Sequence, residues 1–243
     1  MDEERNENDL MKELPLEEGI ITKIERQKRA KDRYNLYIEE QYVFSVHEDV
    51  LIKYSLTKGT AINKDEMKKI VEAQDKQQAY LDAIRLLSFR LRSEYELKAR
   101  LLQKGYELPT IENTLDRLRR EQYIDDSLFA EQLTQQRIQS AKKGRNWIKQ
   151  ELQQKGLKSE HITSAIEQID EQIEYRNAYD LINKKYGSSL KPDSDVQNIK
   201  RKAYALLQRR GYNSRVTTRV VRELTDAANR GIDSEDWEIH FEE

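Results

Sequence analysis

Two kinds of hydrophobic spacing divide the chain. In residues 19–46 apolar and aromatic side chains recur at every second position, most regularly in 34–38 and 42–46. This period of two, with many β-branched and aromatic residues, predicts strands. The basic stretch 26–33 is expected to connect two of them, and Glu39-Glu40-Gln41 to form a short hairpin turn.

The strand pattern ends before residue 47. Residues 47–54 have a helical pattern, and Thr57-Lys58-Gly59 is typical of a turn. We therefore predict a small β-rich domain in which three strands and a short helix bury one face. From about Asn63 to residue 226 the apolar spacing is that of helices.

An internal repeat organises the helical part. The sequences LLQKGY, LQQKGL and LQRRGY align on Gly105, Gly156 and Gly211, with spacings of 51 and 55 residues. A glycine after a helical run takes the left-handed conformation that ends the helix, and the cation before it favours the helix's negative end. Each unit is therefore predicted to contain three helices within about fifty residues.

The predicted fold class is mainly α: tandem three-helix repeats in an elongated curved array, preceded by a small β-rich N-terminal domain. The first helices of the three units are expected at 83–91, 128–138 and 178–186. The expected segments are an acidic tail (1–18), the β-rich domain (19–62), a linker helix and first repeat (63–125), the second repeat (126–173), the basic third repeat (174–225) and an acidic C-terminal tail (226–243).

Local signals indicate where some helices begin. Ser93 and Glu96 have the spacing of a capping box, and Pro109 suits the first turn of a helix. Asp125-Asp126 and Ser159 are expected to supply the starts of two more helices. Contact with a partner is the less favoured role for Asp125-Asp126.

Composition restricts the class of protein. The chain has no cysteine, which excludes disulfides and a Cys-based zinc site. Its first residues are acidic, unlike a secretory signal, and no run approaches the roughly 20 apolar residues that span a bilayer. We therefore expect a soluble cytoplasmic protein.

The near-neutral total of 43 basic and 45 acidic residues hides a strong segregation of charge. Residues 174–225 carry 12 basic and 5 acidic residues, a net charge of +7, whereas residues 1–18 and 226–243 each carry −6. Three interpretations remain open: a solvated helix surface, a surface that meets an anion, or a patch screened by the acidic C-terminal tail. The run between 200 and 222 contains eight cations and no acid: Lys200, Arg201, Lys202, Arg209, Arg210, Arg215, Arg219 and Arg222.

Signatures of enzymatic chemistry are missing from the sequence. No phosphate-binding GxxxxGK or GxGxxG segment occurs, and the three histidines lie in different segments without an i, i+4 partner. We expect no enzyme activity, no metal and no cofactor. Tyr123 and Trp147 are candidate contact residues, although aromatic residues at helical spacing more often belong to a core.

Several short motifs resemble the RecX family of recombinase regulators. The first unit carries Arg90-x-x-Ser93-x-x-Glu96-Leu97 followed by Lys104-Gly105, and the junction carries Tyr123-Ile124-Asp125-Asp126 with Phe129-Ala130. Gln122 stands where the family commonly has glycine. The second unit matches at Arg137, Lys143-Gly144, Ile148, Glu151-Leu152 and Lys155-Gly156. The resemblance covers about residues 80–225, and the leading β segment is like the extension of longer members.

The resemblance implies a non-enzymatic protein that binds the RecA filament on single-stranded DNA. Family members lower strand exchange, ATP turnover and coprotease activity by favouring filament disassembly, in DNA repair, recombination and the SOS response. It implies a monomer that makes weak direct contact with DNA and none with a membrane. The third unit departs most from the family pattern, in its first two helices.

Basic residues on exposed helix faces are the candidate contacts for this partner. The alternative is a general single- or double-stranded DNA-binding protein that uses the basic third repeat. Overall acidity argues against that alternative as the main role. The candidate residues for partner or DNA binding are Arg90, Arg92, Lys98, Arg100, Arg137, Lys142, Lys143, Lys149, Arg209, Arg210, Arg215, Arg219 and Arg222.

Overall fold

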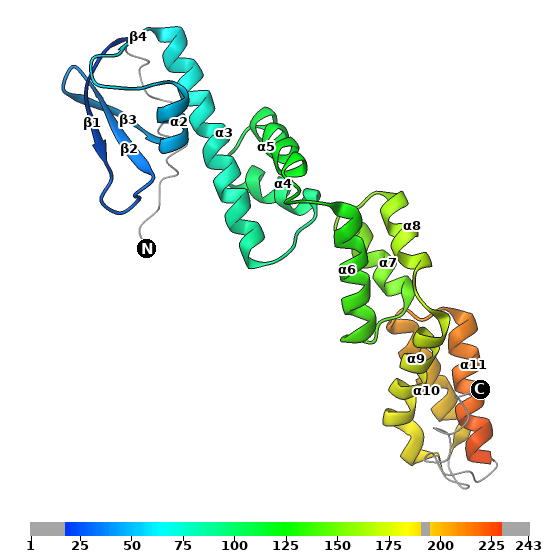
Figure 1. Cartoon of the computed structure of the whole chain (residues 1–243). Coiled ribbons are helices and arrows are strands. Elements are labelled where there is room, and N and C mark those ends of the chain that lie inside the picture. The colour runs from blue at the N-terminus through cyan, green and yellow to red at the C-terminus, as the bar shows by residue number, and fades with distance from the viewer. Residues whose placement is uncertain (1–17, 191–194, 230–243) are drawn as a thin grey trace. The chain divides into compact units, whose positions relative to one another are not determined.

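The computed structural model describes residues 18–190 and 195–229 (Figure 1). The chain divides into two compact units, Met1–Asp125 and Asp126–Glu243. Most of the two acidic tails predicted at 1–18 and 226–243 lies outside the described residues. Among the described helices, none combines the length and the apolar character that crossing a bilayer requires.

The first unit begins with a four-stranded antiparallel sheet in the order β3-β2-β1-β4. Its strands are β1 (Gly19–Arg26), β2 (Arg33–Ile38), β3 (Gln41–His47) and β4 (Ala61–Ile62). The three predicted strands are confirmed. The two-residue β4 was not predicted, because it is too short to show an alternation. Glu39 and Glu40 both have positive φ and make the tight β2–β3 turn, which suits the twist of a hairpin.

One face of the sheet is covered by α2 (Glu48–Lys53) and α3 (Lys64–Phe89). The core between them is formed by alternate strand residues and by apolar residues of α3, among them Ile21, Leu36, Phe44, Met67 and Ile70. Asn63 and Glu66 form a capping box at the start of α3. This reciprocal pair satisfies two backbone N–H groups of the first turn.

The 26-residue helix α3 belongs to both parts of the first unit. The sequence predicted a linker helix followed by a separate helix at 83–91, whereas one continuous helix serves both and ends at Phe89. Residues 64–89 contain neither glycine nor proline, so no residue interrupts the backbone hydrogen bonds. Met67 and Ile70 pack on the sheet, and Ala79 and Ala83 lie in the core of the first repeat.

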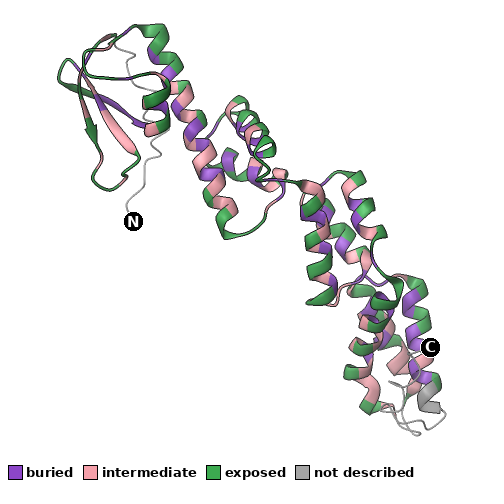
Figure 2. Ribbon diagram, in the orientation of Figure 1, coloured by how far each residue is buried: buried purple, intermediate pink, exposed green. Residues whose placement is uncertain are grey.

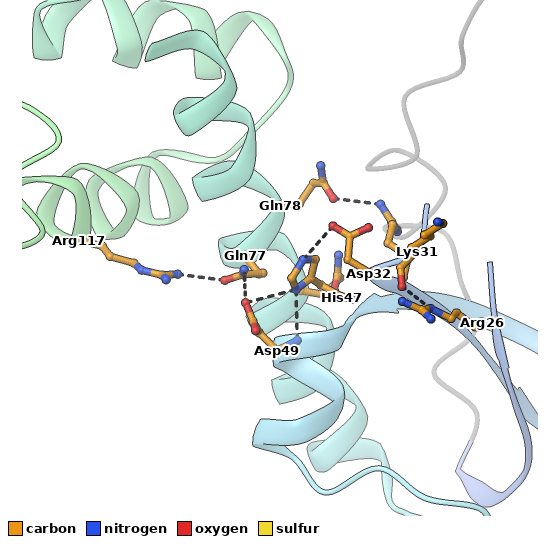
Figure 3. A network of polar contacts seen from close by, with 10 residues as sticks. Arg26, Lys31, Asp32, His47, Asp49, Gln77, Gln78 and Arg117 are labelled. Carbon is orange, nitrogen blue, oxygen red and sulfur yellow. Dashed lines mark hydrogen bonds and ion pairs between the residues drawn. The ribbon is translucent and has the colours of Figure 1, made fainter. Parts of the chain in front are cut away.

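A polar network connects the β domain to the first repeat (Figure 3). The His47 ring lies 3.3 Å from both Asp32 and Asp49, and its backbone N–H donates to Gln74. Gln77 of α3 donates to Asp49 at 2.7 Å and accepts from Arg117 of α5 (Leu108–Arg120) at 3.0 Å. These contacts link the sheet, α2, α3 and α5 by side chains that apolar periodicity does not reveal.

The predicted three-helix repeats are confirmed, and in each the buried residues line the sides where its helices meet (Figure 2). The first consists of the end of α3, α4 (Glu94–Gln103) and α5. The second has α6 (Asp126–Gln139), α7 (Arg145–Gln154) and α8 (Ser159–Glu167), and the third has α9 (Glu171–Tyr186), the 3-10 turn η1 (Gly187–Ser189), α10 (Val196–Arg209) and α11 (Ser214–Asn229).

The first helix of the third repeat is longer than predicted. It begins at Glu171 rather than at residue 178. The prediction placed the start too late because one of the buried positions in the first turns is a charged residue. Glu174 is only 2% exposed, so an apolar pattern does not register the first turns of α9.

The middle helix of every repeat ends in the same way. Gly105, Gly156 and Gly211 have φ values of 89°, 75° and 86°, as predicted for left-handed helix ends. The N–H of the next residue donates to the carbonyl of a buried leucine five positions earlier, and the glycine N–H donates to the residue after that leucine. This pair of bonds is a Schellman motif. The leucines, Leu101, Leu152 and Leu207, are fully buried.

The predicted helix starts are mostly observed. The Ser93 hydroxyl accepts from the Glu96 N–H, Pro109 lies in the first turn of α5, and α6 begins at Asp126. Ser159 is a correction: it is the first helical residue of α8, and Lys158 occupies the N-cap without a side-chain hydrogen bond.

The second and third repeats are joined by direct backbone contact. The Gly144 N–H donates to the Arg210 carbonyl at 2.9 Å, and the Asn146 N–H donates to the Gly211 carbonyl at 3.0 Å. A Cβ on Gly144 would lie 2.4 Å from the backbone of Gly211 and Tyr212. The absence of a side chain at Gly144 therefore allows the two repeats to approach this closely.

A buried ion pair lies beside this contact. Arg145 donates to Glu174 from its backbone N–H at 3.0 Å and from its Nε at 2.7 Å, and the carboxylate is almost fully buried. Asn177 of α9 donates to the Ile138 carbonyl, and the Tyr212 hydroxyl donates to the Lys142 carbonyl. The segment between α6 and α7 is thus fixed against α9 and the end of α10.

We predict that Gly144→Ala lowers the free energy of unfolding of the second unit by about 1–3 kcal/mol, because backbone atoms cannot move aside for the new methyl group. Urea denaturation followed by tryptophan fluorescence, to which Trp147 of the second repeat contributes, would measure the loss. The control is Gly187→Ala, whose Cβ would meet only the Asn183 side chain, and whose helical backbone accepts alanine. An equal effect of both substitutions would contradict the proposed role of Gly144.

Candidate interaction surface

The predicted contact residues of the first repeat mostly have partners within the repeat. The Arg90 guanidinium makes two 3.0 Å hydrogen bonds to the Glu96 carboxylate, which raise the pKa of Arg90. Lys98 pairs with Glu112, and Arg100 donates to Gln103. Arg92 is half-buried and donates to the Leu86 carbonyl. Burial, and then repulsion from Arg90 and Arg100, lowers the Arg92 pKa.

Two of the four candidates in the second repeat are paired with carboxylates, one within the repeat and one in the third repeat. Arg137 holds Glu151 through two hydrogen bonds of 2.7 and 2.6 Å, which raise the Arg137 pKa. Lys142 pairs with Asp180 of the third repeat at 2.9 Å. Lys149 is exposed and has no polar partner among the described residues. The paired residues Arg137 and Lys142 thus hold helices together and present little net charge.

Lys143 lies in a cluster of positive groups at the junction of the second and third repeats. Its ammonium lies 4.0 Å from the centre of the Trp147 ring, a cation–π contact. Burial and then repulsion from Arg210 lower the Lys143 pKa. Beside the cluster, Trp147, Gln150, Arg209 and Tyr212 line a cavity of about 300 Å³. Trp147 thus packs against Lys143 and also lines an accessible hollow.

Two of the five candidates in the third repeat have structural roles. Arg210 donates to the Ala141 carbonyl of the second repeat at 3.1 Å. Arg219 stacks on the Tyr175 ring at 4.4 Å and pairs with Glu223, which also accepts from the Tyr175 hydroxyl. Reversing either charge would therefore disturb the packing of the repeat.

The other three candidates are exposed and weakly partnered. Within the described residues, the Arg209 side chain donates only to the Ala205 carbonyl of its own helix, at 3.3 Å. The Arg215 side chain is 85% exposed, with Glu171 at 4.0 Å, and Arg222 has no polar partner in the described ranges. We name Arg209, Arg215 and Arg222 the third-repeat patch. Among the described residues these three charges are therefore less compensated than those of the other candidates in this repeat.

An exposed apolar group in the first repeat was missed by the sequence analysis. Phe89, Leu91 and Tyr95, around the connection from α3 to α4, are 77%, 51% and 57% exposed. Their signal in the sequence is three large apolar residues where a helix ends and the next begins. Tyr123, a predicted contact residue, is also exposed, whereas the predicted Trp147 is half-buried.

Within the residues that the structure describes, no three His, Asp or Glu side chains are placed to hold a metal ion together. His47 instead belongs to the network of Figure 3, and His161 lies 3.7 Å from Glu160. His240 lies outside the described residues.

Family models match consecutive parts of the chain. The model of the regulatory protein RecX N-terminal domain matches residues 19–63. The models of the first, second and third RecX three-helix domains match residues 79–118, 125–166 and 172–221. These matches follow the order of the sheet and the three helical repeats.

Curated relatives named regulatory protein RecX match over most of their length. The protein from Oceanobacillus iheyensis is 36% identical over 90% of this chain and 80% of its own. The protein from Halalkalibacterium halodurans is 36% identical, with 90% and 82% covered. The protein from Clostridium perfringens is 31% identical, with 86% and 97% covered.

Solved structures show the same fold. A crystal structure of regulatory protein RecX matches with a TM-score of 0.67 and 31% identity, over 83% of this chain and 98% of that one. RecX from Lactobacillus salivarius, at 21% identity and a TM-score of 0.58, covers 63% of this chain and is similar in fold. With the four domain models and relatives at 36% identity over 90% of its length, this chain belongs to the RecX family of regulatory proteins.

Proposed function

We propose that the protein binds the filament that RecA forms on single-stranded DNA and lowers its ATPase, recombinase and coprotease activities by favouring disassembly. It acts as a binding protein without chemistry of its own, in the cytoplasm, in DNA repair, recombination and the SOS response. Family membership supports a regulatory role, and the third-repeat patch is the observation that supports an anionic partner.

The distribution of free charge supports this assignment. In the first two repeats most candidate cations are engaged by carboxylates or amides, as in the pairs Arg90–Glu96 and Arg137–Glu151. In the third repeat Arg209 and Arg222 have no counter-ion among the described residues, and Arg215 has only the distant Glu171 there, at 4.0 Å. A filament built on DNA offers phosphate groups and a protein surface together, so charge can attract it and apolar groups can bind it.

The exposed residues Phe89, Leu91 and Tyr95 are suited to the protein part of such a contact. Large apolar and aromatic side chains contribute most of the binding energy at protein interfaces when water is excluded around them. The side chain of their neighbour Arg90 is 47% exposed while Glu96 fixes its position. We assign this group, together with the third-repeat patch, to filament binding.

General DNA binding is the second candidate function, and the same patch favours it. A surface of three exposed arginines attracts a phosphate backbone with or without RecA. The first function requires the RecA filament, whereas the second requires only DNA. Experiments with and without the recombinase therefore separate them.

We predict that substoichiometric amounts of the protein lower the DNA-dependent ATPase of its cognate RecA. The protein would be titrated at fixed salt into RecA on single-stranded DNA, with binding to bare DNA measured in parallel. A fall in ATPase at protein concentrations too low to coat the DNA supports filament binding. Unchanged ATPase with tight binding to bare DNA would instead establish the general DNA-binding function.

We further predict that reversing the third-repeat patch weakens inhibition. In Arg209→Glu/Arg215→Glu/Arg222→Glu the half-inhibiting concentration should rise about tenfold, since three exposed ion pairs contribute about 0.5 kcal/mol each. Arg210 and Arg219 are left unchanged because they support the fold.

The matched control for this variant makes the same change in net charge elsewhere. Lys64, Lys68 and Lys69 are exposed residues at the start of α3, where glutamate is compatible with the helix. Their triple reversal to glutamate should leave inhibition near that of the unmodified protein, and circular dichroism would verify that both variants fold. Equal losses in the two variants would show a dependence on net charge alone.

A further inference from the structure

In the described part of the chain, α2 and α3 cover one face of the β-domain sheet, and no helix covers the other. Its core face packs against α2 and α3 through Ile21, Leu36 and Phe44. The opposite face carries Lys23, Tyr37 and Tyr42, which are neighbours across three strands in the register Lys23↔Tyr37 and Tyr37↔Tyr42. None of the described helices covers these residues, and Tyr42 is 56% exposed.

The two tyrosines and the lysine form an ordered row. The Tyr37 and Tyr42 rings meet edge to face, with centroids 5.9 Å apart and planes at 70°. The Lys23 ammonium lies 5.1 Å from the Tyr37 centroid. Glu25 is occupied on this face, since it accepts from Lys23 at 3.0 Å and from the Tyr37 hydroxyl at 3.3 Å. The row therefore presents a fixed aromatic platform with an ammonium beside it.

A basic loop lies at one end of this face. The β1–β2 connection and its flanks contain Arg26, Lys28, Arg29 and Lys31, all of them exposed. Lys28, Arg29 and Lys31 make no side-chain ion pair with any described residue. The acidic residues Glu39 and Glu40 are in the β2–β3 turn at the other end of β2. The face is thus positive at one end and aromatic toward the other.

The loop is held in shape by its own contacts, some of which are visible in Figure 3. The Gln27 N–H donates to the Arg33 carbonyl at 2.9 Å, and the Arg26 guanidinium donates to the Lys31 carbonyl. Asp32, the only acid between residues 26 and 33, lies 3.3 Å from the His47 ring. The acidic side chain therefore engages the body of the domain, and the lysines are left to solvent.

We propose that this sheet face and the β1–β2 loop form a binding site for single-stranded nucleic acid. The phosphate groups contact Lys28, Arg29 and Lys31, and a base stacks on the open face of Tyr42. Stacking accepts any base because every base has a π face, so the site has little sequence preference. This site is separate from the third-repeat patch and does not rest on the function proposed above.

The dimensions of the sheet are compatible with a short strand of nucleic acid. Arg26 lies three positions after Lys23 in β1, which is about 10 Å along a strand. A few nucleotides therefore suffice to reach from the loop to the tyrosines. A duplex keeps its bases stacked on one another, so it can use the loop but not Tyr42.

Fluorescence anisotropy of a labelled oligothymidylate would test this site in the full-length chain. The background is the variant with the third-repeat patch reversed, so that the binding measured is not that of Arg209, Arg215 and Arg222. We predict that Tyr42→Ala weakens binding about tenfold and that Tyr42→Phe, which keeps the ring, does not. Lys28→Glu/Arg29→Glu should weaken binding. It should also make the slope of the logarithm of the binding constant against the logarithm of the salt concentration shallower by about 0.7 per lost phosphate contact.

The matched control is Lys68→Glu/Lys69→Glu, which makes the same charge change on α3, a helix that covers the opposite face of the sheet. A loss in the loop variant no larger than in this control would overturn the site. Equal competition by a duplex of the same length would overturn the stacking on Tyr42. Competition by oligouridylate as effective as by oligothymidylate would support a site for both RNA and DNA.

Discussion

The architecture of the helical part depends on one backbone hydrogen bond that occurs three times. In each repeat the N–H after a left-handed glycine donates to the carbonyl of a fully buried leucine. This bond fixes the direction in which the chain leaves the middle helix, so the third helix packs on the other two. In the third repeat the same turn at Gly211 also receives Gly144 of the second repeat. The turn at Gly211 therefore both ends α10 and makes the contact between the second and third repeats.

The same packing decides which charges remain available. Cations that face a carboxylate across two helices, such as Arg137 opposite Glu151, add rigidity but carry little net field. Arg145 and Glu174 go further, since their pair is buried between two repeats and specifies their register. Where acids are scarce, as between residues 200 and 222, Arg209 and Arg210 donate to backbone carbonyls, and Arg219 pairs with an acid outside that run, Glu223. The third repeat is basic in its surface as well as in its composition.

The features that could be predicted from the sequence are those that depend on neighbouring residues along the chain. The glycine alignment identified all three helix ends, and period-two spacing identified three strands. It missed what tertiary contacts control: the unbroken helix α3, the strand β4 and the early start of α9 at a buried Glu174. The predicted contact residues show the same limit, because a basic residue looks alike in sequence whether it pairs with a neighbouring helix, as Arg90 does, or stays free.

Rigidity between the second and third repeats has a consequence for recognition. The backbone bonds at Gly144 and the Arg145–Glu174 pair fix the helices that carry Arg209 and Arg215 relative to the helix that carries Lys149. A preformed surface loses little conformational entropy on binding, and it favours partners whose anionic groups repeat at a matching distance. Flexible linkage of the same charges would attract polyanions in general but would discriminate less among them. For the filament partner proposed above, close packing at Gly144 would thus contribute to selectivity.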